Sequence, residues 1–177
     1  MKLYTRRGDG GKSSILGGRE LWKDDVIFEV LGSLDELSSL LGLCRSKLGP
    51  GEVSELLRKV QVAILRAGVE AQAIRAGIEP RERIGEADVE ELERVIDRFW
   101  PGPAGGFVLP SGSEAAAILH VARAVCRRAE RALVRLVRER GANTKLLLYF
   151  NRLGDLLYAL AMYVNRREGV EEDVAAP

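Results

Sequence analysis

Apolar residues recur every three or four positions along most of this chain, which is the period of an amphipathic α-helix. Connections rich in glycine and proline, which stop helices, interrupt the pattern. The two-residue alternation that marks a strand is almost absent. The sequence therefore predicts an all-α fold, a five-helix bundle in a ferritin-like up-down arrangement. The expected helices span residues 26–47, 52–75, 86–99, 113–138 and 143–165.

The fourth expected helix has two contrasting faces. One is an apolar seam with alternating four- and three-residue steps, formed by Ile118, Ala122, Val125, Ala129, Ala132 and Leu136. The opposite face carries a basic row, Arg123, Arg127, Arg131 and Arg138, with Arg135 at the next four-residue step. Only Glu130 lies within this stretch to offset the repulsion between like charges. The row is either a solvated surface or a site for phosphate, carboxylate or an acidic partner.

Polar residues interrupt two other apolar patterns. The last expected helix is apolar almost all round, so it should be buried on most sides. One stripe of that helix carries Asn151, Asp155, Tyr158 and Met162, with Arg152 beside it. The stripe is either a hydrogen-bond network between helices or a surface that faces a ligand. In the first helix, Asp35 and Glu36 lie at the edge of the apolar face, where they are either solvated or paired with the arginine row.

The first 23 residues differ from the helical remainder in composition. Between residues 5 and 18 lie five glycines, two arginines, one lysine and three hydroxyl residues. Glycine-rich backbone can gather N–H groups around an anion, and lysine and hydroxyl side chains add donors. The segment therefore predicts a polyphosphate-binding loop in which Asp9 acts as a ligand or cap. It is not a Walker A loop, because Arg6 stands where that motif requires glycine.

A disordered tail is the alternative for this segment. Three apolar residues inside it, Tyr4, Ile15 and Leu16, count against disorder because they could anchor it. The segment is also too polar to be a signal peptide.

Composition narrows the remaining choices. The 177 residues indicate one domain, divided into a loop over 1–23, a bundle over 24–166 and a flexible tail over 167–177. A net charge of +1 and the lack of aromatics among the arginines argue against nucleic acid as a partner, and no apolar run could span a membrane.

We interpret Cys44 and Cys126 as buried thiols in a reducing cytoplasm, with a disulfide as the alternative. The single histidine, His120, excludes a multi-histidine metal site.

Taken together, several blocks of sequence resemble the PduO-type corrinoid (cobalamin) adenosyltransferases. No block alone is specific, but together they span most of the chain. The blocks are residues 4–14, 23–25, 32–37, 107–113 running into 120–131, and 151–156. Residues 52–98 match weakly, which leaves the preferred corrinoid open. Three positions depart from the family pattern, Ser111, Gly154 and Tyr158, and none of them removes a charged group.

The resemblance implies a homotrimeric five-helix bundle with active sites between subunits. It also implies transfer of the 5′-deoxyadenosyl group of ATP to cob(I)alamin, with magnesium and release of triphosphate. An intersubunit pair would join Asp35 to Arg127, and Phe107 would be the aromatic residue that keeps a lower axial ligand off cobalt. Nucleotide contacts fall on Thr5, Arg6, Arg7, Gly8, Ser13, Ser14, Lys23, Arg127, Arg128, Glu130, Arg131 and Asn151, to which the loop and the basic row add Asp9 and Arg123.

No metal ligand is assigned on the protein, because magnesium would arrive on the ATP phosphates. A reductase, or an enzyme that accepts the cobalamin product, is the further partner expected. Two alternatives are a non-enzymatic carrier or regulator that binds ATP or a corrinoid, and a structural bundle whose arginines grip an acidic partner.

Overall fold

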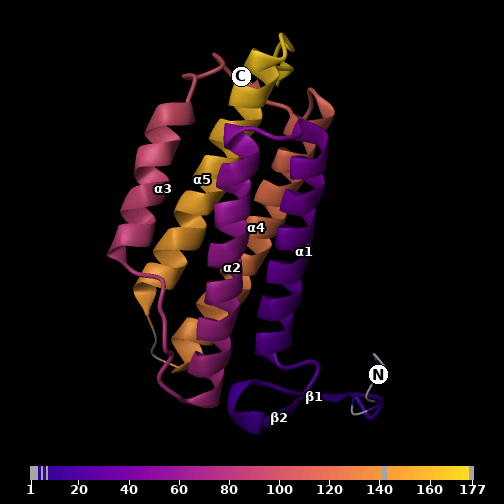
Figure 1. The fold of residues 1–177 in the computed structure, drawn as a ribbon, viewed down its shortest axis with the longest axis vertical. Helices are drawn as coiled ribbons and strands as arrows, with labels where there is room; N and C mark the ends of the chain where they lie inside the picture. Colours follow the sequence, from indigo (N-terminus) through magenta and orange to yellow (C-terminus); the bar gives the residue numbers. More distant parts are fainter. Residues whose placement is uncertain (1–3, 5, 7, 141–142, 176–177) are drawn as a thin grey trace.

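A computed structural model of the protein describes residues 4, 6, 8–140 and 143–175. Five helices run alternately up and down the long axis of the molecule (Figure 1). The predicted all-α bundle is confirmed, and each predicted helix boundary lies within two residues of the observed one. The helices are α1 (Val26–Leu48), α2 (Glu52–Ala76), α3 (Glu86–Phe99), α4 (Glu114–Arg140) and α5 (Thr144–Arg167).

Short polar side chains begin three of these helices. The Oδ1 atoms of Asp25 and Asn143 each accept a hydrogen bond from the amide two residues further on, at 3.1 and 2.9 Å. Ser113 Oγ accepts from the amide three residues on, at 3.3 Å. These bonds satisfy amides that have no partner within the helix. Gly77, with φ of +73°, ends α2 in the left-handed conformation.

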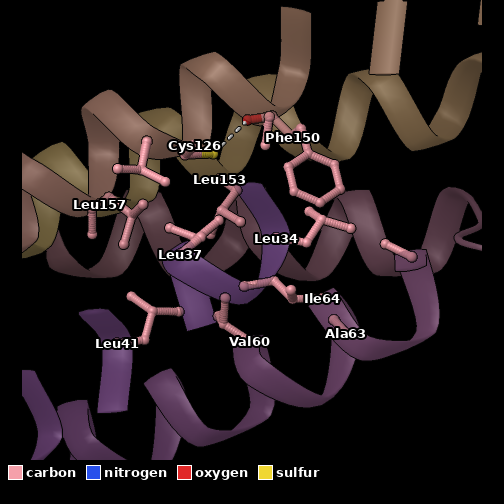
Figure 2. Packing of buried hydrophobic residues seen from close by; sticks show 14 of the residues in the cluster. Leu34, Leu37, Leu41, Val60, Ala63, Ile64, Cys126, Phe150, Leu153 and Leu157 are labelled. Carbon is pink, nitrogen blue, oxygen red and sulfur yellow. Dashed lines mark hydrogen bonds between the residues drawn. The ribbon is translucent and has the colours of Figure 1, made fainter. Parts of the chain in front are cut away.

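The core lies where α1 and α5 pack against α4 and where α2 packs against α1 (Figure 2). Its fully or almost fully buried side chains include Leu37, Leu41, Val60, Ile64, Phe150, Leu153 and Leu157. Each such side chain contributes roughly 1.5–3 kcal/mol by leaving water. Helix α3 packs on α5 at the outside of the bundle.

Both cysteines are buried and free, as the sequence predicted. Cys126 Sγ donates to the carbonyl oxygen of Phe150 at 3.4 Å (Figure 2), and Cys44 Sγ donates to that of Ala115 at 3.6 Å. Burial raises the pKa of both thiols to about 12. The two thiols therefore remain protonated and behave as small apolar groups.

Two short antiparallel ribbons, which the sequence did not predict, lie at opposite ends of the bundle. Strand β1 (Lys12–Ser14) pairs with β2 (Glu20–Trp22) beside the start of α1. Strand β3 (Phe107–Val108) pairs with β4 (Val174–Ala175) beside the end of α5. Strands of two or three residues are too short to show an alternating pattern, so periodicity could not reveal them.

The C-terminal segment, residues 168–175, belongs to the tail that the sequence predicted to be flexible, and it lies against the bundle. Val170 N donates to the carbonyl oxygen of Asn165 at 2.9 Å, and Leu109 N donates to that of Asp173 at 2.8 Å. Backbone pairing holds this charged segment, although it offers little apolar surface to bury. Residues 176 and 177 lie outside the described part of the chain.

Of the helices that the structure describes, none combines the length and the apolar character needed to traverse a bilayer.

One ion pair joins the start of α1 to the last turn of α2. Arg75 Nε donates to Asp25 Oδ1 at 2.9 Å, and Arg75 Nη2 contacts Asp25 Oδ2. The two side chains are only 11% and 17% exposed. The hydrogen bond from Arg75 is the largest influence on the Asp25 carboxyl and lowers its pKa. Asp25 therefore both caps α1 and links the start of α1 to the last turn of α2.

We predict that Asp25→Asn lowers the free energy of unfolding by about 1.5–3 kcal/mol at pH 7, because asparagine keeps the cap and loses the ion pair. The ordinary pKa of an aspartate is about 3.9, and that of folded Asp25 lies lower. The stabilisation is therefore present above pH 4 and is lost as the pH falls through the lowered pKa. Denaturant unfolding of parent and variant at pH 7 and pH 3 tests this, since the difference should shrink at pH 3.

Glu55→Gln is the matched control. It breaks the exposed pair between Arg58 and Glu55, which should change stability by less than about 0.5 kcal/mol at either pH. Equal effects of the two substitutions would contradict the role given to Asp25.

Candidate functional site

The N-terminal loop forms a hairpin that rests on the end of α2. Ile15 is buried, and Leu16 N donates to Gln72 Oε1 at 3.2 Å. Of the three expected anchors only Ile15 is buried, whereas Tyr4 and Leu16 are exposed. This docking favours a folded loop over a disordered tail for residues 8–22. Thr5 and Arg7 lie outside the described residues.

Two backbone amides in the turn before β1 form hydrogen bonds within the turn itself. Gly11 N donates to the carbonyl oxygen of Gly8 at 3.2 Å, and Asp9 N donates to that of Arg6 at 3.3 Å. Lys23 Nζ also bonds the Gly8 carbonyl oxygen, at 2.9 Å. The glycine-rich composition predicted that backbone amides gather around an anion. These two amides instead bond to carbonyl oxygens of the loop itself. Among the described residues of the hairpin, the side chains of Lys12, Ser13, Ser14 and Lys23 are further candidate donors for an anion.

The arginines of α4, those of the row together with the adjoining Arg128, divide into two sets. Arg128 forms an ion pair with Glu36 of α1, and Arg135 forms one with Glu29 at 2.9 Å. Glu130 remains the acid that lies within the stretch itself, and Glu29 of α1 adds a partner for the row from outside it. Of Asp35 and Glu36, it is Glu36 that forms an ion pair with an arginine of α4, and this arginine, Arg128, lies next to the row.

The second set consists of Arg123, Arg127 and Arg131. Among the described residues, Arg127 and Arg131 form no ion pair, and Arg131 Nη1 donates to the carbonyl oxygen of Arg127 at 3.0 Å. Arg123 lies over the ring of Tyr158, with 5.4 Å from its guanidinium carbon to the ring centroid. These arginines leave positive charge that an anion could offset.

The polar stripe of α5 lies beside this second set. Asn151 Nδ2 donates to Glu130 Oε1 at 3.2 Å, which links α5 to α4. Asn151 and Asp155 are exposed, and only Met162 of the stripe is buried. The stripe is thus not a buried network between helices. It adds one acid, Asp155, and the amide of Asn151 to the exposed face that carries Arg123, Arg127 and Arg131.

Phe107 lies at the other end of the bundle from the hairpin. It belongs to β3 and is 76% exposed, so it does not plug the core. The 27 residues of α4 span about 40 Å between these ends, and the hairpin and the C-terminus lie at opposite ends (Figure 1). The predicted residues therefore do not meet in one pocket of a single chain. The basic row of α4 lies between them.

Asp35 lines a groove between α1 and α2 that the sequence analysis missed. The groove has a volume of about 430 Å³, and three exposed apolar residues of α2, Val62, Leu65 and Val69, form part of its wall. Their three- and four-residue spacing places an apolar stripe on the outer face of α2, a pattern that was visible in the sequence. No ion pair joins Asp35 to Arg127 among the described residues of one chain.

Comparisons with known proteins agree with one another. A family model described as cobalamin adenosyltransferase matches residues 3–164. A corrinoid adenosyltransferase from Citrobacter freundii is 37% identical and covers 99% of both chains. The human corrinoid adenosyltransferase MMAB is 35% identical over 98% of this chain and 72% of its own length.

Solved structures of a PduO-type ATP:corrinoid adenosyltransferase from Lactobacillus reuteri share the fold. A phenylalanine-to-histidine variant complexed with cobalamin and ATP superposes with a TM-score of 0.87 and 32% identity, covering 98% of this chain and 96% of that one. An arginine-to-lysine variant complexed with ATP gives the same TM-score and identity, covering 99% and 100%.

We predict that Arg131→Ala weakens the binding of inorganic triphosphate about tenfold or more, because one hydrogen bond to a charged group contributes about 1.5–3 kcal/mol. Arg135→Ala is the matched control from the same row. Since Glu29 already neutralises Arg135, its loss should change the dissociation constant by less than about threefold. Isothermal titration of both variants measures this, and a larger loss in Arg135→Ala would refute the division of the row.

Proposed function

The chain belongs to the cobalamin adenosyltransferase family, and we propose that it transfers the 5′-deoxyadenosyl group of ATP to the cobalt(I) of a corrinoid. The observation that carries this proposal is the match over nearly the whole chain to structures complexed with cobalamin and ATP. The arginines of α4 that no acid neutralises support it, since ATP brings a polyphosphate to the site. The protein is accordingly a transferase.

The reaction requires little chemistry from the protein itself. Cobalt(I) is the nucleophile, and its electron pair forms the bond to C5′ of the ribose. The bond from C5′ to the phosphate oxygen breaks, and triphosphate leaves with that electron pair. The work of the protein is to hold C5′ in line with cobalt and to stabilise the leaving group with positive charge.

Three basic residues are the principal candidates for stabilising the triphosphate. Lys23 is held in the hairpin by its bond to Gly8, and Arg127 and Arg131 have no acid partner among the described residues. Arg128 must share or leave its pair with Glu36 to reach a phosphate. The other proposed nucleotide contacts are Thr5, Arg6, Arg7, Gly8, Asp9, Ser13, Ser14, Arg123, Glu130 and Asn151.

Magnesium accompanies ATP in this proposal. Among the described residues, no group of three or more His, Cys, Asp or Glu side chains is placed to hold a metal ion. The ion would therefore be held mainly by the phosphates.

We further propose a homotrimer with its sites between subunits. The groove beside Asp35 is apolar and open, and Arg127 projects from α4 without an acid partner among the described residues. A second copy whose α4 lies along the groove would cover Val62, Leu65 and Val69 and would pair Asp35 with Arg127. A reductase or an acceptor enzyme for the product is the further partner, and the two buried free thiols favour a cytoplasmic location.

A direct assay tests the function. The protein is mixed with ATP, magnesium and a chemically reduced corrinoid, and the cobalt–carbon product is followed by its absorbance. Product formation is expected. Tight binding of ATP and corrinoid without product would instead support a non-enzymatic carrier or regulator. Parallel reactions with cobalamin and cobinamide identify the preferred acceptor.

The intersubunit pair predicts a specific charge-swap result. Light scattering of the parent should give about three times the 19.5 kDa chain mass. Asp35→Arg should weaken assembly and lower activity, because it places two like charges together in a desolvated contact. Adding Arg127→Asp to Asp35→Arg should restore part of the assembly. A monomeric parent would exclude both the trimer and the pair.

The role proposed for Phe107 predicts that its substitution impairs the handling of the corrinoid and spares the binding of ATP. Phe107→Ala should leave thermal stability nearly unchanged, since the side chain is exposed, and should leave the KM for ATP within about twofold. The four-coordinate cobalt(II) signal of the bound corrinoid should fall, and adenosylation starting from cobalt(II) should slow. Leu43→Ala, which removes another exposed apolar side chain, is the control. An undiminished cobalt(II) signal in Phe107→Ala would eliminate this role.

A further inference from the structure

Asn165, near the end of α5, connects three separate segments. Its side chain is completely buried, and its Oδ1 accepts from Ser113 N, the residue before α4, at 3.0 Å. Its Nδ2 donates to the carbonyl oxygen of Ser111 at 3.4 Å and to both carboxylate oxygens of Glu172 at 3.2 Å. We call Asn165, Glu172, Ser111 and Ser113 the Asn165 clamp. The clamp ties the loop before α4 and the C-terminal segment to the core.

Glycines allow this close approach. A Cβ atom on Gly112 would lie 2.2 Å from Asn165 Oδ1, and the φ of this glycine is +108°. A Cβ atom on Gly106 would lie 2.6 Å from Val174 Cγ1. A side chain at either position would therefore separate the loop from the clamp or from the C-terminal segment.

Backbone pairing continues the connection to Phe107. In the β3–β4 ribbon Phe107 lies opposite Ala175 and Val108 opposite Val174, and Leu109 N donates to the carbonyl oxygen of Asp173. Residues 107–113 are thus held along one edge by the C-terminal segment and at their end by Asn165. Since the Phe107 ring is largely exposed, few packing contacts of its own fix its position. Its backbone must supply that constraint.

We propose that Asn165 and Glu172 are positioning residues that hold the Phe107 segment in register through the C-terminal segment 168–175. The inference rests on the proposed function, in which Phe107 faces the corrin. It assigns residues 168–175 to the corrinoid half of the site. Loosening the clamp should therefore impair the step that depends on Phe107 and spare the nucleotide.

The first test needs no ligand. Glu172→Ala removes the side-chain bond between the C-terminal segment and Asn165, and Glu172→Gln keeps an amide oxygen that can accept it. Amide hydrogen exchange at Leu109 and Ser113 should accelerate about tenfold in Glu172→Ala, which is the loss expected for a hydrogen bond to a charged group. It should return toward the parent rate in Glu172→Gln. Glu171→Ala, at the exposed neighbouring residue, is the control and should exchange as the parent does.

The second test is functional. In Glu172→Ala, the four-coordinate cobalt(II) signal and the adenosylation rate from cobalt(II) should fall by about three- to 100-fold, because small misplacements of a positioning group are costly. The KM for ATP should stay within about twofold. Glu172→Gln should recover most of the loss, whereas a merely structural defect would change the nucleotide and corrinoid parameters together.

The outcomes separate this proposal from the proposed function. An active parent whose Glu172→Ala variant shows unchanged exchange, or accelerated exchange without a cobalt(II) defect, overturns the positioning role alone. Equal effects of Glu171→Ala and Glu172→Ala overturn it as well. A parent that forms no cobalt–carbon product overturns the proposed function, and the assignment to the corrinoid step falls with it.

Discussion

The packing of α4 against α1 and α5 is the contact on which the rest of the molecule depends. Five buried alanines, Ala115, Ala116, Ala122, Ala129 and Ala132, let the neighbouring helices approach this face closely. Because that face is fully used by the core, the charged residues of α4 must all project from the other side. The basic row therefore lies on the same helix that contributes most to the core, and the apolar seam determines the side from which the arginines of the row project.

That arrangement carries an electrostatic cost which the fold only partly relieves. Arginines four residues apart on one helix repel one another by roughly 0.2–0.5 kcal/mol per pair. Helix α1 offsets Arg135 of the row through Glu29, and it offsets Arg128, which adjoins the row, through Glu36. These exposed pairs each contribute about 0–1 kcal/mol, so their main effect is to decide which arginines remain available. The set without acid partners faces the polar stripe of α5, where a polyanion would relieve the remaining repulsion.

Local pattern predicted the helices, and long-range pairing explains what it missed. The caps at Asp25, Ser113 and Asn143 and the apolar periods lie within a few residues of the elements they specify, so sequence alone located every helix. Glu29 and Glu36 reach arginines of α4 from more than 90 residues away. The sequence raised such pairing for Glu36 as one alternative, but it did not indicate Glu29. The C-terminal segment is held mainly by backbone bonds to β3, which leave almost no signature in side-chain composition.

The same contrast between local pattern and long-range arrangement holds for the candidate site. Residue types and the family resemblance predicted Lys23, Arg127 and Phe107 as site residues but did not predict their separation along the bundle. With the hairpin at one end of α4 and Phe107 at the other, the basic row provides the charge between them (Figure 1). In the proposed function, this layout would place the polyphosphate on the arginines and the corrin at the Phe107 end of the bundle. The two halves are built differently, since helix faces fix the arginines rigidly whereas Phe107 depends on a ribbon and a clamp. Selectivity for the acceptor could therefore change through the clamp without altering the nucleotide half.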